Sequence, residues 1–200
     1  MSTGSSGSRS GPASRARPTS RSSAGGSRPT PPWRCATRLG DDAIGTSILD
    51  ELAGEGIDVS PAVRVPGKRS PISAVIVDET GERGLVNFAD RDLPDLVHAL
   101  PARLAPDIDA VLGDSRWPAG SIHMLGLARA AGKPAVLDVD RAEGPLDALV
   151  GAATHAAYAA KAAREHAGVA DLATAVEALA RRFPATTILA TDGPAGVTWV

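Results

Sequence analysis

Apolar residues in the first half of the chain recur at the spacing of an α-helix between Asp41 and Gly56. They lie three or four positions apart, as on one face of a helix, at Ile44, Ile48, Leu49 and Leu52. Asp41 or Asp42 is a suitable N-cap, and the glycines at 54 and 56 end the run. The pattern predicts one amphipathic helix here.

Short segments rich in β-branched residues follow this helix and are separated by turn signals. The turn signals are Pro66-Gly67 and the run from Asp78 to Gly81. Together they predict a small antiparallel sheet over residues 62–89, with strands at 63–65, 72–77 and 85–88.

Strands and helices alternate in the rest of the chain. The predicted strands are 109–114, 135–138, 186–190 and a weaker, alanine-rich one at 152–157. The predicted helices are 96–104, 119–131, 161–166 and 171–183. Strands at this spacing, joined by helices, favour a parallel sheet covered on both faces. The predicted fold class is therefore α/β, with a three-layer α/β/α core and a small antiparallel β-sheet.

Two aspartates end predicted strands of this core. Asp114 and Asp138 fall at carboxyl ends, where parallel sheets bind ligands, and a carboxylate accepts hydrogen bonds from two hydroxyls of a polyol. For Asp114, an N-cap role before Trp117 is an equally open reading. For Asp138 and Asp140, turn and cap roles are the favoured reading.

The segment from Thr191 to Val197 leaves a buried strand, forms a tight turn and enters a second strand. Gly193 and Gly196 permit positive φ and bring the backbone close to a ligand. Backbone N–H groups in such a turn can face a phosphate, and Thr191 adds a hydroxyl. A plain hairpin remains the alternative on these residues alone.

Residues 1–35 differ from the rest because they are mostly Ser, Gly, Arg, Pro and Thr. Such a segment buries too little apolar surface to offset its conformational entropy and is predicted to be disordered. A second hypothesis is that it is read out of frame. Suitable codons for residues 29–35 give Asn-Ala-Ala-Val-Ala-Leu in a shifted frame, a good start for an amphipathic helix. The gene sequence decides between the two.

Composition narrows the possible partners and the compartment. A net charge of −2 gives no reason to expect nucleic acid or an anionic membrane as a partner. The single cysteine, Cys35, excludes an internal disulfide and fits the cytoplasm. No apolar run approaches the ~20 residues of a membrane helix. The histidines lack metal-ligand spacing, so no metal ligand is predicted.

Four motifs in order carry a family resemblance. They are Leu-Gly-Asp-Asp-x-x-Gly at 39–45, Gly-Lys-Arg-Ser-Pro at 67–71, Gly-Glu-Arg at 81–83 and Thr-Asp-Gly-Pro-Ala-Gly at 191–196. In this order and spacing, residues 36–200 resemble the PfkB, or ribokinase-like, carbohydrate kinases. Within that family the chain looks nearest to the ketohexokinase and fructokinase side.

The resemblance implies transfer of a phosphoryl group from Mg-ATP to a sugar, with the small sheet at 62–89 acting as a lid. It implies that Thr191, Gly193 and Gly196 line the ATP site. It also implies that Arg83 reaches the sugar from the lid, that Asp114 lies at the floor of the sugar pocket, and that two copies can pair through the lid. Gly25-Gly26 and the shifted-frame Asn are similar to a sugar-binding motif of the family.

The chain also departs from the family. The usual Asn-x-x-Glu near nucleotide and metal falls around Tyr158 to Lys161, where neither residue occurs, and a frequent serine is replaced by Ala159. The family's Gly-Ala-Gly-Asp segment, with the anion hole and the general base, is expected beyond Val200. No catalytic residue is therefore assigned, and the 200-residue chain is expected to be inactive and poorly soluble.

Two other functions remain open from the sequence. One is a kinase of the same family with another acceptor, such as a nucleoside. The other is a non-catalytic α/β nucleotide-binding or regulatory module. A Rossmann-type dehydrogenase is disfavoured because no Gly-x-Gly-x-x-Gly follows the first strand.

Overall fold

The computed structural model describes residues 33–81, 83–90 and 92–200. Most of the segment predicted to be disordered or out of frame, with Gly25-Gly26, lies outside the described residues. Residues 33–35 are described, and they pair with the body of the chain. Cys35 donates its N–H to the carbonyl of Asp58 at 2.9 Å, and the Asp58 N–H donates to Trp33 at 2.9 Å. For these three residues the prediction of disorder is wrong.

The first unit is a β-α-β arrangement. Strand β1 (Arg38–Gly40) pairs in parallel with β2 (Val63–Val65), and α1 (Ala43–Gly54) connects them. The predicted helix is confirmed with Asp42 as its N-cap. The prediction that 63–65 joins the antiparallel sheet is wrong, because β2 takes β1 as its partner. Strand β1 has only three residues, too few for its alternation to be recognised in the sequence.

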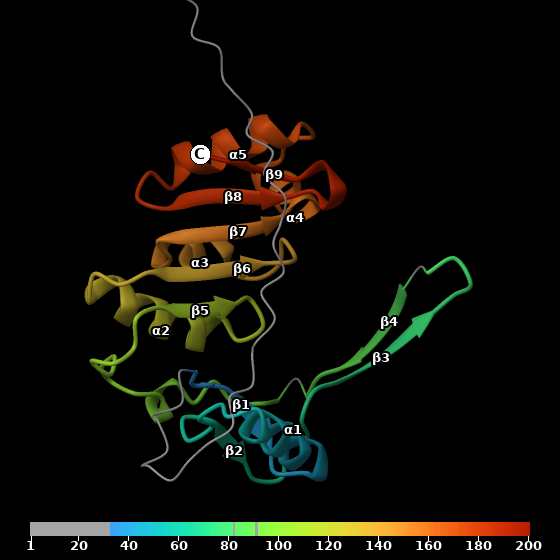
Figure 1. Ribbon diagram of the computed structural model, residues 1–200, viewed down its shortest axis with the longest axis vertical. Helices are drawn as coiled ribbons and strands as arrows, with labels where there is room; N and C mark the ends of the chain where they lie inside the picture. The colour runs from blue at the N-terminus through green and yellow to red at the C-terminus, as the bar shows by residue number, and fades with distance from the viewer. Residues whose placement is uncertain (1–32, 82, 91) are drawn as a thin grey trace, which may run out of the picture.

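The second unit is an antiparallel hairpin of β3 (Ile72–Val77) and β4 (Arg83–Phe88), as the sequence predicted for these strands. In Figure 1 it stands apart from the five-stranded sheet, on the side toward which the parallel strands point. Every residue of both strands is exposed. The hairpin therefore owes none of its position to core packing.

The third unit is a five-stranded sheet in the order β5-β6-β7-β8-β9. The first four strands are parallel, and β9 returns antiparallel to β8. The strands are β5 (Val111–Asp114), β6 (Ala135–Val139), β7 (His155–Ala159), β8 (Thr187–Thr191) and β9 (Val197–Trp199). The connecting helices are α2 (Pro118–Ala130), α3 (Leu146–Ala152), α4 (Ala160–Ala167) and α5 (Leu172–Arg182).

All four helices cover the same face of this sheet. Neighbouring parallel strands follow one another in sequence, and right-handed crossovers then place every connecting helix on one side. Leu137, Tyr158 and Ile188 face these helices and are at most 1% exposed. On the opposite face, Leu112 is 71% exposed and Trp199 is 72% exposed. The α/β fold class is confirmed. Of the three predicted layers, the described residues supply two, the sheet and the helix layer on one of its faces.

Two predicted elements differ from the structure. The predicted helix at 96–104 is only a 3₁₀ turn, η1 (Val97–Ala99). Leu96 before it has a φ of 41°, in the left-handed region, and Pro101 and Pro106 follow. Helix α3 was missed, and the strand predicted from 152 begins only at His155.

In the part of the chain that the structure describes, no helix is both long and apolar enough to cross a membrane.

Candidate functional site

The candidate residues of the sheet gather at one edge because β5 to β8 run in the same direction. Asp114 of β5 and Asp138 of β6 are register partners at this edge. Thr191 ends β8 and is in register with Ala159 of β7. Side chains alternate along a strand, so the register places all four residues on the face opposite the helices. The strands of Asp114 and Thr191 are three spacings apart, about 14 Å across the sheet. Thr191 lies two residues further along its strand than Leu189, the position level with Asp114.

Carboxylates and the guanidinium groups of Arg116 and Arg141 surround the β5–β6 end of this edge. Asp114 accepts a hydrogen bond from the Arg116 backbone N–H at 2.8 Å. Asp140 forms an ion pair with Arg116 and accepts from the Ser115 hydroxyl at 3.4 Å. The alternative that Asp114 caps α2 is wrong, because the N-cap position is Trp117, which makes no side-chain capping bond. Asp114 instead closes a short turn directly after its strand.

Asp138 has a perturbed acidity. Partial desolvation raises the pKa of its carboxyl group above the ordinary value, and the neighbouring carboxylates of Asp140 and Asp114 raise it further. The Arg116 guanidinium acts in the opposite direction. A carboxylate held among other carboxylates is stabilised by hydroxyl donors, so this end of the edge suits a polyol.

The glycine turn lies at the β8–β9 end of the same edge. Gly193 has a φ of 51° and Gly196 a φ of 99°, so the predicted need for positive φ is confirmed at both positions. The Asp192 N–H donates to the Gly196 carbonyl at 2.9 Å and closes the turn. The turn joins β8 to the antiparallel β9, so the expected second strand is also confirmed.

Thr191 and Asp192 connect this turn to its neighbours. The Thr191 hydroxyl lies 3.4 Å from the Tyr158 carbonyl of β7, to which it donates. The Asp192 carboxylate forms an ion pair with Arg164 of α4 at 3.4 Å. These contacts fix the turn against β7 and α4. Within the turn, the N–H groups of Ala195 and Gly196 donate to the carbonyls of Asp192 and Gly193.

Small side chains occupy the middle of the edge. Ala159 ends β7 and Ala160 begins α4, at the place where the sequence lacks the expected Asn and Glu. Lys161 points to solvent with its side chain 85% exposed, and it pairs with Glu165 at 3.8 Å. Among the described residues, those that end β7 and begin α4 at this point of the edge therefore have small side chains.

Arg83 is the predicted site residue that the structure does not bring to this edge. It is the first residue of β4 and pairs with Val77, at the end of the hairpin beside its turn. Figure 1 shows this end of the hairpin away from the sheet. A role for Arg83 therefore requires the hairpin to approach the edge.

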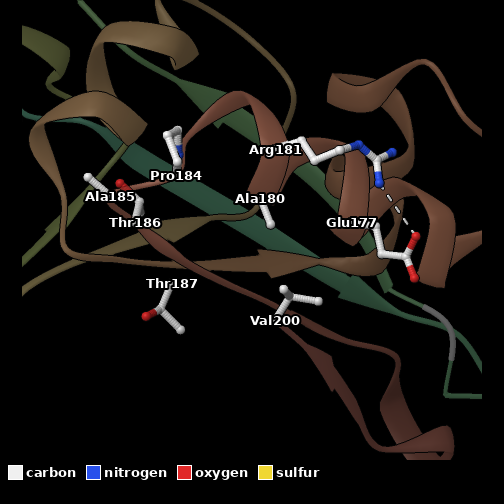
Figure 2. Close-up of a pocket in the computed structure, with 8 residues that line it drawn as sticks. All are labelled: Glu177, Ala180, Arg181, Pro184, Ala185, Thr186, Thr187 and Val200. Carbon is white, nitrogen blue, oxygen red and sulfur yellow. Dashed lines mark ion pairs between the residues drawn. The ribbon is translucent and has the colours of Figure 1, made fainter.

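A hollow elsewhere on the surface does not belong to this site. It lies near the start of β8, at the opposite end of the strand from Thr191, and Figure 2 shows the ion pair of Glu177 and Arg181 at its side. Its other lining residues are Ala180, Pro184, Ala185, Thr186, Thr187 and Val200. Among residues 33–81, 83–90 and 92–200, no group of three or more His, Cys, Asp or Glu side chains is arranged to hold a metal ion.

Sequence reasoning missed the ion pairs of this site, among them Arg116 with Asp140 and Arg164 with Asp192. The partners of the second pair are 28 positions apart, and no local pattern joins them. The parallel register supplies the missing signal: α4 begins directly after β7, and β7 lies beside β8.

Comparison with known proteins gives one family. The sequence model of the pfkB family carbohydrate kinase matches residues 34–200. A protein of Agrobacterium tumefaciens provisionally named a ribokinase is 39% identical, with a TM-score of 0.74 over 84% of this chain and 55% of its own.

Two more distant structures share the fold. An Arabidopsis thaliana ribokinase solved with ribose and ATP is 17% identical, with a TM-score of 0.64 over 83% of this chain and 57% of its own. A fructokinase of Vibrio cholerae is 19% identical, with a TM-score of 0.66 over 84% of this chain and 62% of its own. The chain thus spans little more than half the length of these relatives, and they do not favour fructokinases over ribokinases. The chain belongs to the PfkB family of carbohydrate kinases.

Proposed function

We propose that this chain carries the sugar-binding and nucleotide-binding edge of an ATP-dependent sugar kinase. The activity is transfer of the γ-phosphate of ATP to a carbohydrate hydroxyl. One observation carries the proposal. In a member of the PfkB family, the carboxylates Asp114 and Asp138 and the turn at 193–196 lie at one edge of the sheet, about three strands apart.

Each end of the edge has a chemical role in this proposal. Asp114 and Asp138 accept hydrogen bonds from hydroxyls of the sugar. Gly193 and Gly196 allow the backbone to approach the phosphates of ATP, and the Thr191 hydroxyl adds a polar group. The phosphates bring Mg²⁺ with them, since this ion is usually held by substrate phosphates and only one or two carboxylates.

The phosphoryl transfer itself needs further groups. A base takes the proton of the attacking sugar hydroxyl, and hydrogen-bond donors stabilise the charge on the transferred group while ADP leaves. The family resemblance places both functions in a segment beyond Val200. We therefore propose that the 200-residue chain by itself does not turn over.

The acceptor is a sugar, and we retain the fructokinase side of the family as the narrower proposal, with ribose as the main competitor. The relative that is 39% identical bears a ribokinase name, so both sugars belong in any assay. Nucleosides test the other acceptor class. A protein that binds nucleotide and phosphorylates nothing is the non-catalytic alternative.

The hairpin supports a further part of the proposal, pairing of two copies through the lid. The register puts Ile72, Ala74 and Ile76 on one face of the hairpin together with Val86 and Phe88. Ile76 and Val86 are each 64% exposed. An isolated two-stranded hairpin is marginally stable in water, and a second copy on this face supplies the missing cover.

With one thiol and ATP as co-substrate, we place the protein in the cytoplasm.

A chimera tests the function. Residues 36–200 replace the matched 55% of the Agrobacterium relative, and release of ADP is measured with ribose, fructose, other hexoses and nucleosides. We expect release of ADP that depends on one class of sugar, and none from the 200-residue chain alone. A folded chimera that binds ATP and phosphorylates no acceptor contradicts the kinase proposal and favours the non-catalytic alternative.

A matched pair of variants locates the sugar. Asp114→Asn in the chimera removes one acceptor at the edge and is expected to raise the KM for sugar more than that for ATP. Glu177→Gln changes a carboxylate at the distant hollow of Figure 2 and is expected to alter neither. Equal effects of the two variants contradict the assignment of the acidic end.

A further inference from the structure

Among the described residues, the hairpin of β3 and β4 has no further strand partner, so the two arms that join it to the body set its orientation. The incoming arm is residues 66–71, and the outgoing arm is the described part of 89–94. Figure 1 shows the hairpin leaving the body beside β1 and α1. The contacts of the two arms therefore decide where the hairpin points.

Asp42 holds the incoming arm. Its Oδ2 accepts the backbone N–H of Ser70 at 2.9 Å, and its Oδ1 accepts the Ser70 hydroxyl at 2.7 Å. The same Oδ1 accepts the Gly45 N–H at 2.8 Å, which is the N-cap bond of α1. The Gly40 N–H donates to Ser70 Oγ at 3.1 Å, and Ser70 is only 1% exposed. One carboxylate thus joins β1, α1 and the arm.

The two glycines beside this carboxylate leave no room for a side chain of their own. A Cβ on Gly40 would lie 2.3 Å from the Lys68 carbonyl oxygen of the arm. A Cβ on Gly45 would lie 2.5 Å from the Gly40 carbonyl oxygen and 2.6 Å from Ser70 Oγ. The glycines of the 39–45 motif are therefore needed here for close approach and not for unusual φ. The arm is pressed against β1 and the first turn of α1.

The outgoing arm is tied to the same strand and to the incoming arm. The Arg38 guanidinium of β1 donates to the carbonyls of Leu93 and Pro94, the latter at 2.6 Å. Asp90 accepts the backbone N–H of Arg69 at 3.1 Å, which joins one arm to the other. Both arms are thus fastened to β1, and the strongest set of bonds on the incoming arm converges on Asp42.

We propose that Asp42 is a positioning residue whose carboxylate fixes the direction of the hairpin through Ser70. The pKa of the Asp42 carboxyl group is lowered, first by the hydrogen bonds from Ser70 and then by the one from Gly45. This agrees with a carboxylate that stays ionised in the junction. The consequence for a sugar beneath the lid rests on the proposed function, but the position of the hairpin does not.

Distances between two spin labels test the proposal without any enzymatic activity. In a Cys35→Ser background, one label is attached at Glu79→Cys in the hairpin turn and the other at Glu51→Cys on the exposed face of α1. We expect one narrow distance distribution for the parent chain. Asp42→Asn is expected to lose this single peak and give a broad distribution.

Asp42→Asn is a suitable variant because asparagine is as good an N-cap as aspartate. It keeps an oxygen for the Gly45 N–H but replaces one of the two acceptors of Ser70 by a donor. The Ser70 amide proton is expected to exchange about tenfold faster or more, as for loss of a charge-assisted hydrogen bond. Asp41→Asn is the control, since the Asp41 carboxylate pairs with Arg64 and does not touch the arm.

A second variant keeps the test decisive if Asp42→Asn does not fold. Ser70→Ala removes the hydroxyl and leaves the backbone N–H, so a smaller broadening and intact α1 are expected. The proposal is overturned if the label distance stays narrow in a folded Asp42→Asn or Ser70→Ala chain, or if Asp41→Asn broadens it equally. If the chimera does not phosphorylate a sugar, the expected label distances stay the same. The kinase proposal and the proposal for Asp42 can therefore be refuted independently.

Discussion

Asp114 and Asp138 are register partners at the carboxyl ends of β5 and β6, and the charge of the first raises the pKa of the second. A pair of carboxylates in this position lowers stability at neutral pH. A binding site that receives hydroxyl donors gains from the same arrangement, because the donors compensate the repulsion between the two groups.

The first prediction concerns the stability that is lost because Asp138 lies beside other carboxylates. A group whose pKa is raised on folding stabilises the folded state below its ordinary pKa and loses that stability as the pH rises through the raised value. Asp138→Asn is therefore expected to raise the melting temperature at pH 7. The gain should be below about 0.5 kcal/mol, because the side chain is largely exposed. Thermal melting measures it, and a fall in melting temperature contradicts the prediction.

The second prediction compares two helix glycines. Gly45→Ala forces a Cβ to within 2.6 Å of Ser70 Oγ and is expected to destabilise by about 1–3 kcal/mol. Gly126 in α2 has no atom within 4 Å of its Cβ position, so Gly126→Ala is expected to stabilise by about 0.5–1 kcal/mol. Urea unfolding of both variants measures the difference, and effects of the same sign refute the packing argument at Gly45.

The third prediction is a pH dependence that originates at Asp42. Bonds from Ser70 and Gly45 lower the pKa of its carboxyl group from 3.8 to about 2. A lowered pKa contributes stability above the ordinary value, and this contribution is lost as the pH falls from about 4 toward 2. Asp42→Asn should be less stable than the parent at pH 7, and the difference should shrink over that range. A constant difference in urea unfolding between pH 7 and pH 2 contradicts the assignment.

The fourth prediction concerns the face of the sheet that no described helix covers. Leu112 and Trp199 are 71% and 72% exposed, and apolar patches of this kind promote association. A Leu112→Lys, Trp199→Lys double variant is expected to reduce light scattering of the 200-residue chain while leaving its melting temperature nearly unchanged. Leu137→Ala on the helix-covered face is the contrast, with an expected loss of about 2–5 kcal/mol. Equal melting temperatures for Leu137→Ala and the parent contradict this division of the sheet.

The fifth prediction separates the two faces of the hairpin. Ile76 lies on the wholly apolar face, and Val75 lies on the other, where Ser73 donates to Asn87 at 2.6 Å. Ile76→Lys is expected to give a monomer in sedimentation equilibrium, whereas Val75→Lys keeps the dimer. Both measurements use the Leu112→Lys, Trp199→Lys background to suppress other association. Pairing through the lid is contradicted if both variants form dimers, or if the parent chain is monomeric at every concentration.

The sequence predicted those elements whose pattern is long and locally complete. Helices α1, α2, α4 and α5 match predicted helices, and each predicted core strand has a counterpart in the sheet. Strand β1 has three residues and α3 has seven, lengths at which periodicity carries little information. The partner of β2 could not be predicted because the partner itself was not recognised.

The bare face of the sheet could not be predicted for a different reason. Leu112, Val136 and Leu189 are apolar, so both faces of these strands read as buried. That is the pattern of a sheet covered on both sides. The sequence reports what the strands are suited to contact, whereas the structure reports what the described residues place there.

The candidate site was predicted best where its geometry is local. Positive φ at Gly193 and Gly196 follows from the glycine spacing of the turn, and Asp114 follows from its place at the end of a strand. The junction at Asp42 was recognised only as a helix cap. Its second role depends on Ser70, which lies 28 positions away and is brought close in a fold where β1 and β2 pair.

The placement of α2 to α5 on one side has a consequence for interpreting natural variation in this chain. Unfolding experiments on these 200 residues detect changes at Ile188 or Tyr158, whose side chains meet the helices. The same experiments give almost no change in melting temperature for substitutions at Leu112 or Trp199. A variant at either position can therefore melt like the parent and still be defective in any assembly where another segment packs on that face of the sheet.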